Sequence, residues 1–350
     1  MKSPFPRIMG IGTAVPENRF EQDRVKELAG DFFNGHLPNL ARFLPVFDNT
    51  LIRTRYFVRE VEWYLKSHTF AEKNDVFQKT ALELAVKASK KAISQSGVDP
   101  ADIDGVVFVS STGIATPSLD SYLMQELDIS RNAARMPIWG IGCAGGVSGL
   151  ARAAEMVKAR NSVAVLLVSV EVCSISFQME DKSLSNLVGT SLFADGAAAV
   201  VVGPGNRGME IMGSHSRLFD NTDYMMGWEI LDSGLKVIFS KEIPGFVLNG
   251  VSGIMEEFCD SFGISRHDVR NFVMHPGGPR VLEAYEKGLE IEGDKLSSAY
   301  KVLADYGNMS SPSVLFVLED FLENNEASGG YGAMMALGPG FSAEELLFKW

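Results

Sequence analysis

The chain has few cysteines, no excess of basic residues and no hydrophobic run long enough to cross a bilayer. Its 350 residues include only Cys143, Cys173 and Cys259, which are widely spaced and form no CxxC pair. That number and spacing exclude a disulfide-stapled scaffold and indicate reduced thiols. No two His or Cys residues lie at metal-ligand spacing, so the sequence predicts no metal site.

The charge balance and the absence of long apolar segments narrow the class of protein further. Acidic residues outnumber basic ones by 44 to 32, which gives a net charge of −12. Such a charge repels phosphate backbones, so nucleic acid is excluded as a general partner, although a local group of basic residues can still hold one small anion. The longest apolar runs, 163–168 and 197–202, are too short to span a membrane, and the first residues lack the apolar part of a secretory signal. We expect a soluble, cytoplasmic protein without a membrane span.

What the chain does contain is a regular alternation of strand and helix patterns. Its length and its 46% apolar content are those of about two domains or one doubled domain. β-Branched runs predict buried strands, and apolar spacing predicts amphipathic helices. The expected strands are 104–110, 162–170, 271–274 and 333–337, and the expected helices are 76–94, 146–160, 251–262, one from Pro279 and one after Pro312.

This order of elements predicts an α/β fold with a parallel or mixed sheet in each half. The glycine- and proline-rich segment 203–205 is the best place to divide the chain, into 1–205 and 206–350. No repeat between the halves is visible at the level of residue letters.

Three glycine-flanked motifs carry residues that can do chemistry: GIGCAGG at 140–146, HPGG at 275–278 and GNMSSP at 307–312. Cys143 is expected just before a helix N-terminus, where the helix dipole favours the thiolate, so it is a candidate nucleophile. The alternative is that Cys143 is a small buried hydrophobe, and for Cys173 and Cys259 that alternative is favoured.

His275 and Asn308 are the candidate partners of this cysteine. His275 ends an apolar strand, at the sheet edge where open α/β sheets carry their active sites, and an imidazole there can pair with a thiolate. The amide of Asn308 can donate to an oxyanion without adding charge. The structural alternatives are a strand-end histidine and a helix-capping asparagine.

A competing signal comes from Gly140, Gly142 and Gly145, which fit the spacing of a dinucleotide-binding fingerprint. Glu171 follows the next strand, where an acid would meet a ribose, but it lies 26 positions after Gly145 rather than about 20. Nucleotide binding is therefore not favoured.

Taken together and in this chain order, the three motifs resemble those of the type III polyketide synthases, the chalcone and stilbene synthase family. The resemblance includes LGPGF at 337–341 and FADG at 193–196, and it spans nearly the whole chain. Segments 137–140 and 148–155 are most similar to the alkylpyrone-forming synthases of bacilli. The resemblance implies a thiolase-like αβαβα layered fold of two similar halves that works as a homodimer.

The resemblance also assigns roles to the three candidate residues. Cys143 would be acylated by an acyl-CoA, His275 would hold it as a thiolate, and His275 with Asn308 would stabilise the enolate formed when malonyl-CoA loses carbon dioxide. Coenzyme A thioesters are then the substrates, and no resident cofactor is implied.

Further positions carry over from the family to the substrate chamber. Phe193 matches a gatekeeping phenylalanine, and Val237 replaces the second gatekeeping aromatic, which is expected to widen the gate. Thr116 matches a residue inserted across the dimer interface and Ser176 a chamber-wall residue. Both are small, which suits a long, slender acyl chain.

A hydrogen-bonded trio that activates water in stilbene-forming members matches Ser111, Glu171 and Ser310. Gly338 and Pro339, in the closing motif, are also assigned to the substrate site. For the phosphates of coenzyme A only Arg42 falls on a basic position of the family. Arg53 and Arg55 are nearby substitutes, with solvated surface charge as the alternative.

The sequence thus predicts an acyltransferase that condenses a long-chain fatty acyl-CoA with malonyl-CoA and releases an alkylpyrone or alkylresorcinol. One rival is a carrier-protein-dependent enzyme similar to ketoacyl synthase III, in which Gln-Ala-Asn is expected after the histidine. The others are a Cys-His-Asn thioester hydrolase and a non-catalytic binding protein with a vestigial chamber. Starter length, number of extensions and ring closure depend on cavity shape, which no motif reports.

Overall fold

The computed structural model describes residues 5–160, 164–205, 208–324 and 329–350. Its strands are β1 (Pro6–Ala14), β2 (Asn18–Glu21), β3 (Thr54–Phe57), β4 (Ile103–Val109), β5 (Ala134–Ile138), β6 (Ala164–Val172), β7 (Asp195–Pro204), β8 (Glu210–Leu218), β9 (Met226–Leu231), β10 (Gly234–Phe239), β11 (Val269–Met274), β12 (Tyr331–Gly338) and β13 (Ser342–Lys349). Its α-helices are α1 (Gln22–Phe33), α2 (Leu40–Phe43), α3 (Val46–Asn49), α4 (Val61–Tyr64), α5 (Phe70–Ser96), α6 (Asp120–Glu126), α7 (Gly145–Arg160), α8 (Leu184–Leu192), α9 (Ile243–Ser261), α10 (Pro279–Leu289), α11 (Ser297–Tyr306) and α12 (Ser313–Asn324). Its 3₁₀ turns are η1 (Pro100–Asp102), η2 (Gly142–Ala144), η3 (Cys173–Ser176) and η4 (Arg266–Asp268).

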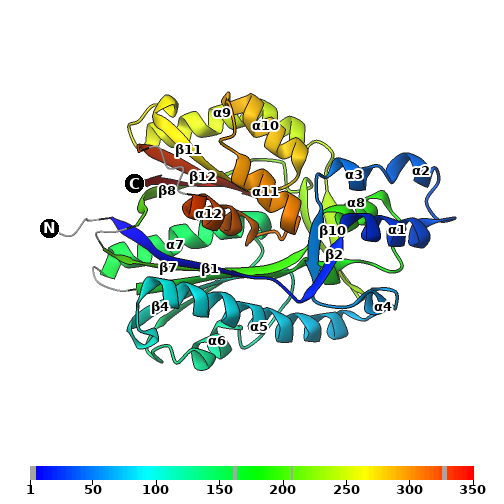
Figure 1. Ribbon diagram of the computed structural model, residues 1–350, viewed down its shortest axis with the longest axis horizontal. Coiled ribbons are helices and arrows are strands. Elements are labelled where there is room, and N and C mark those ends of the chain that lie inside the picture. Colours follow the sequence, from blue (N-terminus) through cyan, green and yellow to red (C-terminus); the bar gives the residue numbers. More distant parts are fainter. Residues whose placement is uncertain (1–4, 161–163, 206–207, 325–328) are drawn as a thin grey trace.

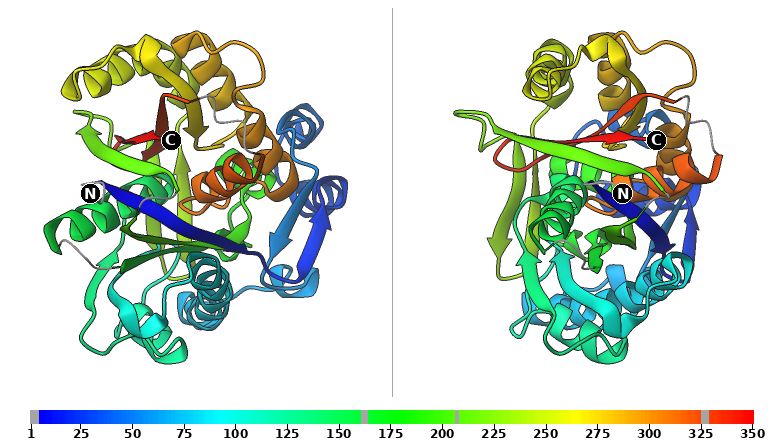
Figure 2. Two further views of the ribbon diagram at one scale, coloured as in Figure 1. Left: turned by 60° about the vertical axis from the view of Figure 1, so that its left-hand side comes forward. Right: turned by 90° about the vertical axis from the view of Figure 1, so that its left-hand side faces the viewer.

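Helices and sheet alternate in five layers, as Figure 1 shows. The strands of the main sheet follow the order β11-β12-β13-β8-β1-β7-β6-β4-β5. Only one residue pair, Arg7 with Glu210, joins β1 to β8, so the sheet divides there into two stacked parts. Helices α7 and α12 lie between the two parts, α9 and α10 cover one outer face, and α5 and α6 cover the other (Figures 1 and 2). This is the expected αβαβα layering.

The two parts of the sheet repeat one pattern of strands. In the first, β1 pairs antiparallel with β7, β7 antiparallel with β6, and β6 parallel with β4. In the second, β8 pairs antiparallel with β13, β13 antiparallel with β12, and β12 parallel with β11. The halves are thus similar in structure although no repeat is visible in the letters. The division at residue 205 stays a prediction, because one hydrophobic core contains residues of both halves.

The elements expected from sequence patterns are all present, with shifted ends. Every residue of β6 is buried, as its continuous apolar run predicts; residues 162 and 163 of the expected strand lie outside the described residues. Helix α5 starts earlier than expected, at a capping box formed by Thr69 and Glu72. Helix α9 begins at Ile243, two turns before the helix expected from residue 251. Its first turn contains a proline, and a helix tolerates proline at this position.

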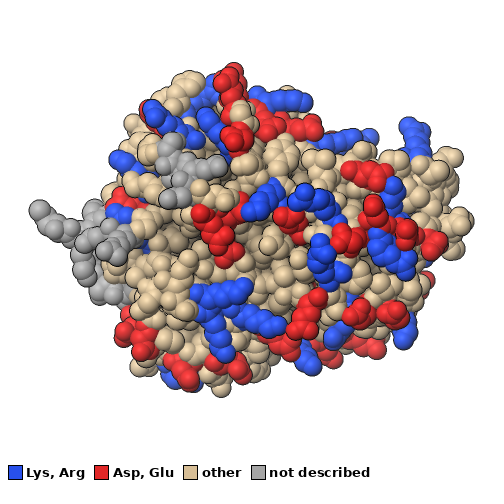
Figure 3. Space-filling model, in the orientation of Figure 1, with Lys and Arg blue, Asp and Glu red and all other residues tan. Residues whose placement is uncertain are grey.

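Beside the layered sheets lies a smaller lobe that contains α1, α2, α3, α8, the two-stranded sheet of β2 and β3, and the β9–β10 hairpin (Figure 1). Its own apolar cluster includes Val25, Phe33, Phe47 and Leu187. Acidic and basic side chains are interspersed over the face in Figure 3. Within the described residues, no helix is both long and apolar enough to cross a membrane.

Candidate active site

Cys143 lies in a tight turn between β5 and α7, and local glycines make that turn possible. Gly140 and Gly142 have φ angles of 93° and 44°, in the region that disfavours other residues. The backbone N–H groups of both glycines donate to Ser111 Oγ, at 3.2 and 3.1 Å. The turn therefore presents Cys143, which is 5% exposed, at the N-terminal end of α7.

The start of α7 packs directly on the segment that precedes α12. A Cβ atom on Gly146 would lie 2.3 Å from the backbone oxygen of Ser311, so only glycine allows this approach. The contact brings Ser310 to the sulfur, and the Cys143 thiol donates to Ser310 Oγ at 3.5 Å. The second half of the chain thereby reaches the cysteine of the first half.

A short series of contacts connects Asn308 and His275 to the same place. Ser310 N–H donates to Asn308 Oδ1 at 2.8 Å, and Asn308 Nδ2 donates to Gly277 O at 3.2 Å. Gly277 N–H donates in turn to His275 O at 2.9 Å. The structure therefore links Cys143, Asn308 and His275 through Ser310 and Gly277, and all three side chains are buried.

Burial sets the protonation of the cysteine and the histidine. Burial raises the pKa of Cys143 to about 11, although the hydrogen bond to Ser310 opposes the shift. Burial also lowers the pKa of His275 to about 3. Both shifts favour the uncharged form of the group, the thiol of Cys143 and the neutral imidazole of His275, whereas the helix dipole alone favours a thiolate.

A small cavity of about 20 Å³ adjoins the sulfur. Phe193, Val237, Ser310 and Pro339, all expected at the substrate site, line it together with residues of the β9–β10 hairpin. Gly338 does not line this cavity; it packs against η2, where a Cβ atom would lie 2.6 Å from the Cβ of Ala144.

Val237 lines both this cavity and a second one, and the wider gate expected from it stays a prediction. Trp228 is its cross-strand partner in the β9–β10 hairpin. The rings of Trp228 and Phe239 lie 5.9 and 5.8 Å from the ring of Phe193. Trp228 and Phe239 therefore line this cavity together with Phe193 and Val237.

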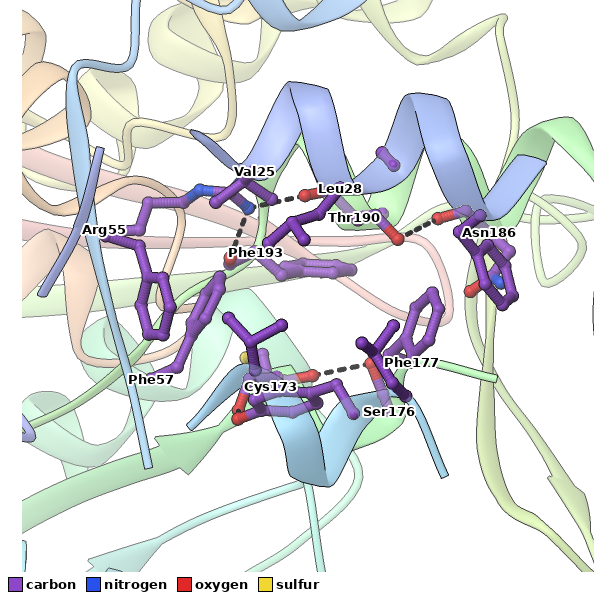
Figure 4. Close-up of a pocket in the computed structure, with 18 of the residues that line it drawn as sticks. Val25, Leu28, Arg55, Phe57, Cys173, Ser176, Phe177, Asn186, Thr190 and Phe193 are labelled. Carbon is purple, nitrogen blue, oxygen red and sulfur yellow. Dashed lines mark hydrogen bonds between the residues drawn. The ribbon is translucent and has the colours of Figure 1, made fainter. Parts of the chain in front are cut away.

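A second cavity, of about 100 Å³, lies beyond Phe193 and Val237, which line both. Most of its wall is apolar side chains from α1 and the neighbouring segments, and Ser176 lines it as expected. In Figure 4 the ring of Phe193 lies between α1 on one side and Cys173 on the other. An elongated apolar group is the ligand that such a wall suits.

The expected trio around Glu171 has different members. The side-chain hydroxyls that donate to the Glu171 carboxylate belong to Thr112 and Ser311, both at 2.7 Å, and to Ser110 at 3.3 Å. Ser111 donates only its backbone N–H, at 2.9 Å, and Ser310 contacts the sulfur instead. Burial raises the pKa of Glu171 to about 7, against the effect of these donors.

The three arginines expected to hold coenzyme A lie in different environments. Arg42 is exposed at the end of α2. Arg53 is exposed too, but pairs with Asp305 at 2.5 Å. Arg55 is fully buried and donates to the carbonyl oxygens of Thr190 and Phe193, at 2.6 and 2.9 Å. The assignment of Arg55 to a surface phosphate site is therefore wrong.

Thr116 lies on an exposed loop and lines neither cavity. Its surroundings include Ile114 and Trp139, whose exposed fractions are 43% and 52%. An apolar surface of this kind is typical of a protein interface, which is where the resemblance puts Thr116.

Sequence reasoning missed Trp228, Phe239, Thr112 and Ser311. A signal for the first two exists in the turn residues Asp232-Ser233-Gly234, which predict a hairpin and hence a cross-strand pairing of its two strands. No such signal exists for the hydroxyls of Thr112 and Ser311. Each is adjacent to the serine that was predicted instead, and the sequence does not show which of two neighbouring side chains points toward Glu171.

Comparison with known proteins gives a consistent result. Two family descriptions match the chain: "Chalcone and stilbene synthases, N-terminal domain" at residues 5–206 and the corresponding C-terminal domain at residues 210–350. The "Putative chalcone synthase" of Bacillus subtilis (strain 168) is 42% identical, over 98% of this chain and 98% of its own. The "Alpha-pyrone synthesis polyketide synthase-like" protein of Mycobacterium tuberculosis (strain H37Rv) is 30% identical, over 97% and 90%. The crystal structure of 1,3,6,8-tetrahydroxynaphthalene synthase, a bacterial type III polyketide synthase from Streptomyces coelicolor A3(2), aligns with a TM-score of 0.93 at 27% identity, covering 98% of this chain and 99% of that one.

Proposed function

Because the chain belongs to the chalcone and stilbene synthase family and is a type III polyketide synthase, we propose that it condenses a long-chain fatty acyl-CoA with malonyl-CoA and releases an alkylpyrone or alkylresorcinol. The observation that carries the proposal is the set of contacts that joins Cys143 to Asn308 and His275 beside two adjoining cavities.

The first step is loading of the starter on Cys143. His275, held neutral by burial, accepts the proton of the thiol, and the sulfur attacks the thioester carbon of the acyl-CoA. The bond between that carbon and the coenzyme A sulfur breaks. The proton leaves with coenzyme A as its free thiol, so loading takes no proton from solvent.

The second step is decarboxylative condensation. Malonyl-CoA loses carbon dioxide, and the electron pair of the broken C–C bond forms an enolate. Asn308 has a second amide N–H besides the one that donates to Gly277, and this N–H can donate to the enolate oxygen. The enolate carbon then attacks the Cys143 thioester, the C–S bond breaks, and the thiolate of Cys143 is released.

The second cavity supports an aliphatic starter. Its lining is mainly apolar, and the hydroxyl of Ser176 is satisfied within the wall because it donates to Cys173 O at 2.7 Å. An alkyl chain in this cavity would pass Phe193 and Val237, which separate it from the sulfur. The relative from M. tuberculosis, named for α-pyrone synthesis, supports a pyrone product.

The protein partner in this proposal is a second copy of the chain, and the exposed apolar surface around Ile114 and Trp139 supports a homodimer. The cytoplasmic location expected from the sequence stays a prediction.

The test is incubation with lauroyl-CoA and malonyl-CoA, followed by mass spectrometry of the products. Wild type should give alkylpyrones, and Cys143→Ala should give none, a loss of at least about 10³-fold. Cys259→Ala changes a buried cysteine of α9 away from both cavities and should retain activity.

Other products would contradict the proposal. A naphthalene made from malonyl-CoA alone would rule out the fatty starter. Release of free fatty acid without malonyl-CoA would indicate a hydrolase, and activity only with malonyl on a carrier protein would indicate an enzyme similar to ketoacyl synthase III.

A further inference from the structure

Few hydrogen bonds hold the β9–β10 hairpin to the rest of the molecule. The hairpin pairs with no other strand, although it supplies side chains to the cavity at the sulfur. Among the described residues, two hydrogen bonds join segment 226–239 to other elements. In one, the backbone N–H of Phe70 donates to Asp232 O at 2.9 Å. In the other, Gln178 Nε2 donates to Leu235 O at 3.0 Å, so a single buried side chain supplies this second bond.

Gln178 is itself fixed from two sides. Its backbone N–H and its backbone oxygen both bond to the side chain of Asn186 in α8, at 3.3 and 2.8 Å. The residue before it, Phe177, accepts a hydrogen bond at its backbone oxygen from Lys73 Nζ of α5, at 2.7 Å. In Figure 4, Asn186 and Phe177 lie at one end of the second cavity, which both of them line. The amide that reaches Leu235 is therefore anchored to two helices, α5 and α8.

The hairpin and α8 form two sides of the passage between the cavities. Val237 belongs to the hairpin, Phe193 directly follows α8, and each of them lines both cavities. The two sides are in contact, because a Cβ atom on Gly189 of α8 would lie 3.2 Å from Val237 Cγ1 and 3.6 Å from the ring of Phe193. A displacement of the hairpin relative to α8 therefore changes the width of the passage.

Gln178 connects these two sides. It is bonded to α8 through Asn186, and to the hairpin through Leu235. Val237 lies two residues after Leu235 on the same strand, so both side chains point to one face of it. Loss of the amide donor would leave the backbone oxygen of a residue that is 4% exposed without this partner, which is costly in an interior.

We propose that Gln178 is a specificity-determining residue: it fixes the hairpin against α8 and so keeps the passage at Phe193 and Val237 narrow enough to admit an unbranched acyl chain and to exclude a starter with a bulky end. This inference rests on the proposed function. Gln178 lines neither of the two cavities, so it is a positioning residue that acts through the hairpin.

The first measurement tests the attachment of the hairpin. Gln178→Met keeps a side chain of similar volume and removes the donor to Leu235 O. We expect hydrogen exchange of the backbone amides of segment 226–239 to become about tenfold faster. Gln125→Met is the matched control, because Gln125 also donates from its amide to a backbone oxygen, that of Ser121 at 3.0 Å, but from an exposed position on α6. It should match wild type.

The second measurement tests the passage through single-turnover acylation of Cys143. Wild type should react at least about tenfold faster with lauroyl-CoA than with ω-phenyloctanoyl-CoA, whose ring must pass Phe193 and Val237. In Gln178→Met we expect the ratio of the two rates to fall about tenfold, through faster acylation by the phenyl thioester. Gln178→Asn keeps an amide that is one methylene shorter, and should shift the ratio in the same direction.

The outcomes distinguish this inference from the proposed function. Equal rates with the two thioesters in wild type, or an unchanged ratio in both Gln178 variants, would overturn the inference alone. Equal slowing with both thioesters, or failure of both variants to fold, would also overturn it, because either result assigns Gln178 to general packing. A wild type that neither thioester acylates would overturn the proposed function as well.

Discussion

Glu171 illustrates how the immediate partners of one side chain decide its chemistry. Its carboxylate is fully buried and accepts from three hydroxyls and a backbone N–H. Even with these donors, burial holds its pKa at about 7. A carboxyl group poised in this way can take or give a proton, so if water is activated here, Thr112 and Ser311 are the hydroxyls that take part.

The raised pKa of Glu171 has a predictable effect on stability. Between pH 4.5 and about 7 the folded protein binds more protons at this group than the unfolded chain does, so stability falls as pH rises through that window. We expect the unfolding free energy of Glu171→Gln, relative to wild type, to increase by up to about 3 kcal/mol from pH 4.5 to pH 8. Urea unfolding at the two pH values measures this difference. Glu283→Gln, at an exposed position of α10, should stay within about 0.5 kcal/mol of wild type at both. A relative stability of Glu171→Gln that falls with pH would contradict the assignment.

At the scale of elements, the β9–β10 hairpin controls the space at the sulfur. It contributes Trp228, Val237 and Phe239 to the small cavity, and Phe193 closes the opposite side. The hairpin pairs only with itself and is separate from the main sheet. The size of the cavity at the sulfur therefore depends on a hairpin that is not part of the layered sheet.

Removal of one ring from this hairpin should change the product. Trp228→Ala enlarges the cavity beside Cys143, so we expect products with more malonyl units than those of wild type, measured by mass spectrometry of the same incubation. Ile230→Ala is the control, because Ile230 lies on the same strand, is 59% exposed and lines neither cavity. An unchanged product distribution in Trp228→Ala would show that the hairpin does not limit extension.

At the scale of the whole molecule, the two repeated halves meet at the N-terminal ends of α7 and α12. Continuous apolar runs and helical spacing predicted the alternating elements, because those patterns are local, whereas the αβαβα layering was expected from the family resemblance. The choice of Ser311 over Ser310 as the partner of Glu171 depends on side-chain direction and on a contact between distant segments, which one sequence does not encode locally. The same limit explains Arg55, since burial of a basic residue depends on what packs around it.

The contact between the halves makes a prediction of its own. In Gly146→Ala the new methyl group would meet the backbone of Ser311, so we expect a loss of about 1–3 kcal/mol in unfolding free energy, together with slower loading of Cys143. Gly253→Ala is the matched control: its position in α9 has open space, and the change should stabilise the protein by about 0.5–1 kcal/mol. Thermal unfolding and the acylation assay measure both effects. Equal stability of the two variants would contradict the close approach of α7 and α12.

The contact between Gly146 and Ser311 also sets how far apart the two candidate reacting groups can lie. Cys143 stands at the N-terminal end of α7 and Asn308 a few residues before α12, so the spacing between the sulfur and the amide depends on how closely these two segments pack.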